Sequence, residues 1–231
     1  MGEHRLPGSP PVPLTLRRSG RARRISLRVS RLDGRVTLTL PIGVPEREAL
    51  DFAQAKAEWI RDHLSNRAED WQLAPGADLP VEGRSRRVEA ARGRAVTLSE
   101  DRIEVPQAQG GVRLQRFLRE LARDRLAAAA DVYAARLGRD YARITIRDTR
   151  SRWGSCSSEG ALMFSWRLIL ARPEVLNYVA AHEVAHLAEM NHSPAFWAQV
   201  ARIHGPYDAP RHWLRTHGPD LHRYRFETGG A

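Results

Sequence analysis

Two histidines and a glutamate stand together in the stretch His182-Glu183-Val-Ala-His186. Residues four positions apart share one face of an α-helix, so His182 and His186 can offer two imidazole nitrogens to a single metal ion. Glu183 lies beside them, where its carboxylate can take a proton from a metal-activated water. These residue types at this spacing are typical of zinc hydrolases, and they predict that Glu183 is a general base.

A third histidine, His192, follows at the offset that H-E-x-x-H-x-x-G-x-x-H zinc proteases use, although Glu189 stands where that pattern has glycine. We therefore expect one Zn²⁺ held by His182, His186 and His192, with water in the fourth position. Further histidines nearer the C-terminus compete for the third position but lack this local spacing; they are His204, His212, His217 and His222.

A helix that begins at Pro173 must carry the first two histidines, because proline suits a first helical turn and an apolar stripe follows it. The stripe consists of Leu176, Ala180, Val184 and Leu187. Asn191 is interpreted as a left-handed helix terminator, Ser193 as the cap of a second helix and Pro194 as its first residue. His192 then lies at a turn, where the chain can reverse and return this imidazole to the metal.

The second helix supports the site from behind. Phe196 and Trp197 are expected to press it against the metal-binding helix and so hold His192 in place. The run His204-Gly-Pro ends this helix, and Tyr207 follows it closely. Tyr207 is a candidate donor to the oxyanion that develops in acyl transfer.

A peptide substrate can be held by adding its backbone as a strand to an exposed sheet edge. Strands are predicted at 142–147 and 161–166, joined by a loop rich in small residues. The second of these strands is the expected edge, and the candidate substrate-binding residues are Trp153, Ala161, Met163 and Ser165. The alternative is an ordinary hairpin loop with Trp153 packed into the core. Cys156 is interpreted as a small buried residue rather than a nucleophile.

The first half of the chain predicts a small β-rich module with one helix, and thus an α+β protein. Residues 1–13 are expected to be a disordered lead, and 14–106 the module. It contains a hairpin around Asp33-Gly34, a helix over 45–67 and short strands between 79 and 105. A boundary is predicted at 107–111, followed by a long helix over 112–137 that Gly138 ends. The second domain then spans 112–225.

The chain has 231 residues, a formal net charge of +10 and a pI near 10.9. Such charge is compatible with nucleic-acid binding, but arginine supplies almost all of it, with Lys56 the one lysine, which is also what genome composition can produce. The arginines at 21–24 are interpreted as a solvated face. No apolar run is long enough to span a membrane, and the one cysteine fits a reducing compartment, so we expect a cytoplasmic protein.

Four stretches together resemble the YgjP-like zinc metallopeptidases, a family related to the SprT and WLM groups. They are Arg152-Trp-Gly-Ser-Cys-Ser, Phe164-Ser-Trp-Arg-Leu-Ile-Leu, Asn177-Tyr-Val-Ala-Ala-His-Glu-Val-Ala-His-Leu and Asn191-His-Ser-Pro-Ala-Phe-Trp. The resemblance implies a minimal zincin-like domain with His182, His186 and His192 as metal ligands and Glu183 as general base. Asn177 departs from it, because that family often has an acidic residue there.

The function predicted is zinc-dependent hydrolysis of peptide bonds in a protein or peptide substrate, with Glu183 taking the proton of the metal-activated water. Two alternatives remain open. One is a basic nucleic-acid-associated protein whose zinc domain is accessory or inactive. The other is a zinc hydrolase with a non-peptide substrate, which would share the same metal chemistry.

Overall fold

The computed structural model describes residues 4–30, 33–65 and 70–226, in two compact units that divide the chain between residues 69 and 70. The described residues form a mixed α+β fold, as the sequence predicts, and their strands make four small sheets. We call residues 1–69 unit 1 and residues 70–231 unit 2. No helix among the described residues is long and apolar enough to cross a membrane.

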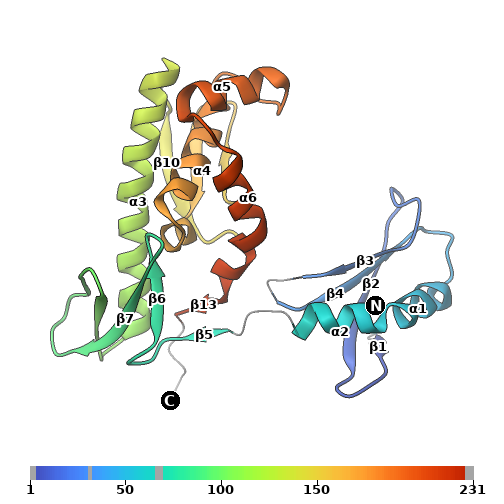
Figure 1. Ribbon diagram of the computed structural model, residues 1–231. Coiled ribbons are helices and arrows are strands. Elements are labelled where there is room, and N and C mark those ends of the chain that lie inside the picture. Colours follow the sequence, from blue (N-terminus) through green and yellow to red (C-terminus); the bar gives the residue numbers. More distant parts are fainter. Residues whose placement is uncertain (1–3, 31–32, 66–69, 227–231) are drawn as a thin grey trace. The chain divides into compact units, whose positions relative to one another are not determined.

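Unit 1 is a four-stranded sheet, in the order β1-β2-β4-β3, with two helices packed against it (Figure 1). Its elements are β1 (His4–Leu6), β2 (Val12–Arg18), β3 (Ser26–Val29), β4 (Val36–Leu40), α1 (Glu46–Ala55) and α2 (Ala57–Ser65). The strands alternate buried apolar and exposed polar residues, so one face is apolar. That face packs against Ala53 and Ile60 of the helices, and both residues are fully buried.

The hairpin predicted around Asp33-Gly34 is confirmed by the antiparallel pairing of β3 with β4. Two other expectations are corrected. The single helix over 45–67 is two helices, because the backbone at Lys56 leaves helical geometry (φ −105°, ψ 16°); its expected end at Arg67 lies outside the described residues. Residues 4–13 are not a disordered lead, since β1 pairs antiparallel with β2 and buries Leu6; residues 1–3 are not described.

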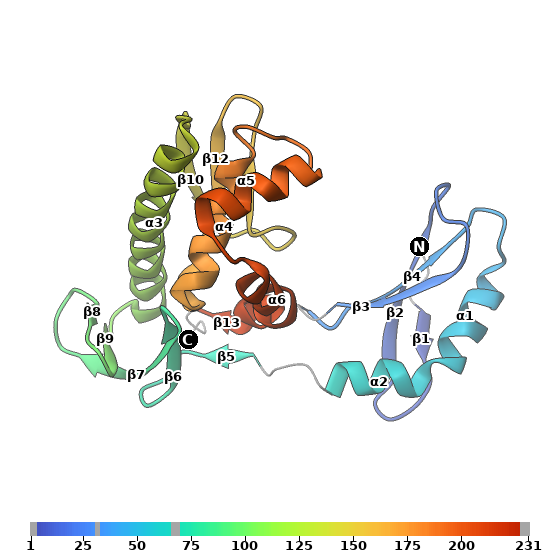
Figure 2. The same ribbon diagram turned by 45° about the horizontal axis from the view of Figure 1, so that its top comes forward.

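Unit 2 contains three sheets: β6-β7-β9-β8, β10-β12-β11, and the pair β5-β13. Their bounds are β5 (Trp71–Gln72), β6 (Asp78–Val81), β7 (Arg84–Ala91), β8 (Thr97–Leu98), β9 (Arg102–Pro106), β10 (Arg143–Arg147), β11 (Gly154–Cys156), β12 (Ala161–Ser165) and β13 (Tyr224–Arg225). The short strands predicted between 79 and 105 and the strands predicted at 142–147 and 161–166 are thereby confirmed. The pair β5-β13 joins the beginning of unit 2 to its end (Figure 2).

The long helix α3 (Gly110–Leu137) connects the sheets of unit 2, and it ends as predicted at Gly138, whose φ is +71°. Its buried Leu114 and Leu118 share one apolar core with Leu79 and Ile103 of the preceding strands. Because those strands pack on α3, the compact units divide the chain at 69/70 and not at the boundary predicted over 107–111.

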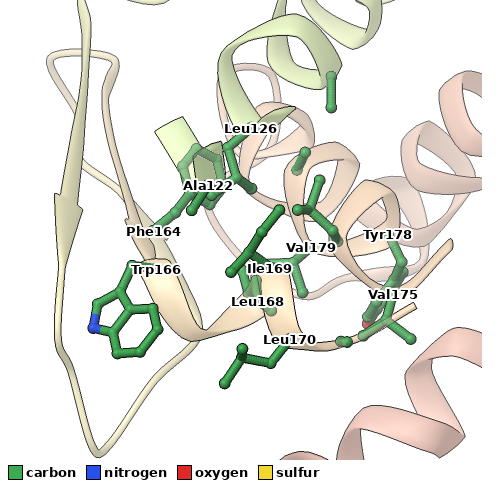
Figure 3. Close-up of a cluster of buried hydrophobic side chains, with 14 of the residues drawn as sticks. Ala122, Leu126, Phe164, Trp166, Leu168, Ile169, Leu170, Val175, Tyr178 and Val179 are labelled. Carbon is green, nitrogen blue, oxygen red and sulfur yellow. The ribbon is translucent and has the colours of Figure 1, made fainter. Parts of the chain in front are cut away.

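After β12 the chain forms a 3-10 helix, η1 (Trp166–Leu170), and then α4 (Pro173–Ala185), α5 (Pro194–His204), α6 (Asp208–His217) and a second 3-10 helix, η2 (Gly218–Arg223). All five residues of η1 are buried. Figure 3 shows side chains from α3, β12, η1 and α4 gathered in one apolar cluster. This cluster fixes α4, the helix that carries the first two histidines.

Candidate metal centre

Helix α4 starts at Pro173, as predicted, and buries nearly its whole surface, including Ala180, Ala181 and Val184. It ends at Ala185, so His182 lies in its last turn and His186 is its C-terminal cap residue. Apolar neighbours on the other sides leave the face that carries the histidines as the side of the helix available for chemistry.

The turn after α4 brings His192 back towards the first two histidines. Ser193 caps α5 as predicted, since its Oγ accepts a hydrogen bond from the Phe196 N–H at 3.3 Å, and Pro194 is the first helical residue. The expectation for Asn191 is wrong, because among the described non-glycine residues only Glu82 and Gln109 have positive φ. A short non-helical turn therefore reverses the chain without a left-handed terminator.

His182, His186 and His192 converge, with one ring nitrogen from each lying within 4.8 Å of the others. The Nε2 atoms of His182 and His192 are 3.0 Å apart. Two nitrogens bound to one tetrahedral zinc at 2.0–2.1 Å would lie roughly 3.3 Å apart, so the cluster is close to the size that an ion requires. The other histidines, at 204, 212, 217 and 222, belong to no such group among the described residues.

Two aromatic side chains of α5 pack against the imidazole rings of the three histidines. Phe196 is fully buried, and its ring centroid lies 4.9, 4.5 and 4.8 Å from those of His182, His186 and His192. Trp197 stacks on His192 at 5.8 Å. The predicted support of the site by these aromatics is therefore present, and it reaches all three histidines.

Hydrogen bonding orients the rings. The Nδ1 atom of His186 lies 2.9 Å from the Glu189 carbonyl oxygen, which can only accept, so this ring donates from Nδ1 and keeps the lone pair on Nε2. Glu189, the departure from the glycine-containing protease pattern, thus acts through its backbone. The Nδ1 atom of His182 is buried and has no hydrogen-bond partner among the described atoms.

Burial also sets the charge state of the cluster. Desolvation, helped by the neighbouring His186 and His192, lowers the pKa of His182 to about 3, and desolvation lowers the pKa of His186 as well. Glu183 is only 6% exposed, and burial raises the pKa of its carboxyl to about 8 against the opposing effect of Arg152. Neutral imidazoles with free lone pairs are what a divalent cation binds, so His182 and His186 fit a metal site.

The histidines face a small pocket of about 240 Å³, and strand β11 forms its opposite wall. The lining residues are Gly154, Ser155, Cys156, His182, Glu183, His186, Met190 and His192. Glu183 packs directly on the backbone of β11, because a Cβ placed on Gly154 would lie 2.5 Å from its Cγ. Cys156 is half-buried, and burial together with the Glu183 charge raises the pKa of its thiol to about 11.

The expectation that strand 161–166 is an exposed edge is wrong. β12 is the central strand, since Ala161, Met163 and Ser165 lie in a ladder that pairs with β10 on one side and β11 on the other. The strand beside the histidines is β11, an outer strand of this sheet. The sequence assigns β11 to a loop, because its Gly-Ser-Cys residues resemble a turn.

Trp153 packs into the core, as the alternative interpretation of the loop predicts. Its indole lies against Gly218 and 5.1 Å from the ring of His222, so η2 supports the residue that leads into β11. Tyr207 is half-buried and stacks on Trp197 at 5.2 Å. It does not line the pocket, and its role as an oxyanion donor stays a prediction.

Sequence reasoning missed one charged residue near the site. The guanidinium of Arg211 lies 4.3 Å from the centre of the Trp197 ring, and its charge contributes to the lowered pKa of His182. Arg211 lies one helical turn after Tyr207, at the beginning of α6. The spacing of these two residues in the sequence is the signal that could have placed Arg211 near Tyr207.

The model of the YgjP-like family, described as a metallopeptidase domain, matches residues 23–217. No curated protein matches the chain. Among solved structures, the metallopeptidase zymogen abylysin of Pyrococcus abyssi is similar to it at 21% identity and a TM-score of 0.37, with 43% of this chain and 98% of that chain covered. Since the family model spans most of the sequence, the chain belongs to the YgjP-like metallopeptidase domain family.

Proposed function

We propose that this protein is a zinc-dependent metallopeptidase that hydrolyses peptide bonds. The observation that carries the proposal is the convergence of three imidazoles beside a buried glutamate, at an outer strand of a sheet. Membership of a metallopeptidase family supports it. Each component has a separate role that can be tested.

His182, His186 and His192 are assigned as the ligands of one zinc ion. A zinc ion in this position would lower the pKa of a coordinated water towards ~7 and polarise the scissile carbonyl. Neighbouring residues orient the three histidines for metal binding. The Glu189 carbonyl fixes the tautomer of His186, and Phe196 restricts the rotation of all three imidazole rings.

Glu183 is assigned as the general base, which takes a proton from the attacking water and passes it to the leaving amine. It follows His182 on the same helix and faces the same pocket. The backbone at Gly154 limits the carboxylate from the opposite side. Packing of this kind holds a proton-transfer group in one orientation, which general acid–base catalysis requires.

The peptide substrate is proposed to lie along β11. Backbone pairing to an outer strand binds an extended chain regardless of its sequence. A peptide added there would pass over the pocket that contains the three histidines and Glu183. We assign residues 112–225 as the zincin-like catalytic portion of unit 2, with β11 replacing the edge that the sequence predicts at 161–166.

The test compares wild type with Glu183→Gln. Both proteins are purified, their zinc content is measured, and cleavage of a mixture of unfolded proteins is followed. We expect the variant to keep its zinc and to lose nearly all cleavage, because the amide cannot accept the proton. Glu174→Gln is the matched control, since this exposed glutamate lies in the first turn of the same helix. Full cleavage by Glu183→Gln would refute the assigned mechanism.

A further inference from the structure

One face of the unit 1 sheet is open to solvent and carries only arginines, hydroxyl residues and a proline. The helices cover the other face, as Figure 1 shows. The strand registers place Arg5 beside Pro13, Thr15 beside Thr37 and Arg28, and Arg17 beside Thr39 and Ser26. The alternation of burial along β2, β3 and β4 puts all of these side chains on the uncovered side.

The face has a single sign of charge. Arg5, Arg17 and Arg28 are exposed, and none of them forms an ion pair or side-chain hydrogen bond with a residue that the structure describes. No acidic residue occurs in any of the four strands. Solvated sheet faces usually mix both signs, because opposite charges on neighbouring strands attract each other. A face with one sign alone lacks this compensation.

Charge is segregated within unit 1. Its described acidic residues lie mostly on the two helices that pack against the opposite face; they are Glu46, Glu48, Asp51, Glu58 and Asp62. Arg18, which points to the helix side, is neutralised there by an ion pair with Glu46 at 3.5 Å. Arg5, Arg17 and Arg28 of the open face have no such acidic partner among the described residues.

The loop between β2 and β3 carries further basic residues. Arg21, Arg23 and Arg24 lie in this loop and are all exposed. Across the sheet, Arg17 and Arg28 lie two strand spacings and two residues apart, which corresponds to about 12 Å at standard strand geometry. Side chains this far apart contact separate charges on a partner, so the ligand must be an extended polyanion and not a single small anion.

We propose that this face binds the phosphate backbone of a double-stranded nucleic acid, without reading its sequence. Arginine and hydroxyl side chains are the groups that contact phosphate oxygens in protein–nucleic acid complexes. No aromatic residue lies on the face, so it offers no platform on which unpaired bases would stack. It also lacks the apolar side chains that insert into a lipid surface.

The binding is measured by fluorescence anisotropy with a duplex of about 20 base pairs over about 50 to 200 mM salt. The test variant carries Arg5→Gln, Arg17→Gln and Arg28→Gln. The control removes the same charge from exposed positions in unit 2, with Arg92→Gln, Arg94→Gln and Arg139→Gln. Because each lost phosphate contact changes the slope of log affinity against log salt by ~0.9, we expect the slope to fall by about 2.7 in the test variant only.

At physiological salt the affinity of the test variant should fall roughly tenfold or more, while the control stays within about twofold of wild type. Thr15→Glu provides a second test that removes no arginine, since it places a carboxylate in the middle of the face and should also weaken binding. Equal losses in the test and control variants would overturn the proposal, because they would show that only total charge matters.

Duplex DNA, duplex RNA, an unpaired strand and phosphatidylserine vesicles are compared as ligands. Similar affinity for DNA and RNA duplexes is expected if the face binds the phosphate backbone. Binding to only one of the two duplexes would identify which nucleic acid supplies the phosphates. Preference for the unpaired strand or for vesicles would refute the proposal. The result is independent of the proposed peptidase function, because zinc content and cleavage should be unchanged in all of these variants.

Discussion

The two units of this protein present polar residues in opposite ways. Unit 2 buries its reactive groups: Glu183 is 6% exposed, and the pKa of His182 is lowered to about 3 mainly by desolvation. Unit 1 keeps the arginines of its open face in water, on strands whose other side is apolar. Burial converts imidazoles into neutral ligands for one ion, whereas exposure preserves charge for long-range attraction. The first arrangement suits chemistry, and the second suits weak, extended binding.

The largest expected effect is the loss of one ligand from the histidine cluster. His192→Ala should reduce zinc affinity by more than the ~100-fold that outer partners of a metal cost, because it removes a direct ligand. Zinc competition against a chromophoric chelator measures this. His212→Ala is the control, since His212 is exposed and belongs to no metal-binding group. Unchanged affinity in His192→Ala would assign the third position to another residue.

Gly154→Ala tests whether the position of the Glu183 carboxylate matters for catalysis, and it changes none of the three histidines. The added methyl group would meet the Glu183 side chain at 2.5–2.8 Å, so the carboxylate must move. Displacement by about 1 Å costs roughly 100-fold in rate. We expect kcat to fall by about this factor, with KM and zinc content nearly unchanged. Gly93→Ala, where a methyl group would meet nothing, is the matched control. Wild-type kcat in Gly154→Ala would show that β11 does not position the base.

A smaller effect should appear in the pH dependence of stability. Burial, followed by the charge of Arg167, lowers the pKa of His222 to about 4 from its usual value of 6.5. The unfolded chain therefore binds this proton at higher pH than the folded protein does, and stability is lost as pH falls from about 6.5 to about 4. In His222→Asn the free energy of unfolding should depend less steeply on pH across this window. Chemical denaturation at several pH values measures it, and an unchanged slope would contradict the assignment.

The smallest expected effect separates the two units directly. Raising salt from about 50 to about 200 mM should change zinc affinity by less than about twofold, because imidazoles bind a metal ion as neutral ligands and salt hardly screens neutral groups. Over the same range, duplex binding by unit 1 should weaken strongly. Competition titrations with zinc and with the duplex, in one buffer series, test the contrast. A steep salt dependence of zinc affinity would mean that the site is more exposed than the structure indicates.

The sequence predicts the ligand cluster well because its geometry is local. Helical spacing relates His182 to His186, and the cap at Ser193 with Pro194 places His192, so short-range rules suffice. The substrate edge could not be predicted in the same way. Which strand is central depends on the parallel pairing of β10 with β12, a long-range contact, and β11 consists of residues that resemble a turn.

The division into units shows a similar limit. The segment 107–111 resembles a linker, yet the core contacts of Leu79 and Ile103 with α3 join the strands before it to the helix after it. A break in the hydrophobic pattern of the sequence, such as 107–111, marks the change from one secondary-structure element to the next and not the end of a hydrophobic core. Alternation in the sequence indicates a sheet with one solvated face, but the single sign of charge on that face becomes evident only from the registers of the four strands.

The pairing of β5 with β13 means that unit 2 is completed only when its last strand pairs with its first. Trp71, near its first residue, packs against Tyr224 and Phe226 at its end. During synthesis these contacts form only after the two helices that flank the histidine cluster have emerged, because α4 and α5 precede β13 along the chain. A polypeptide that stops before β13 therefore contains every proposed zinc ligand and still lacks the strand that completes the unit.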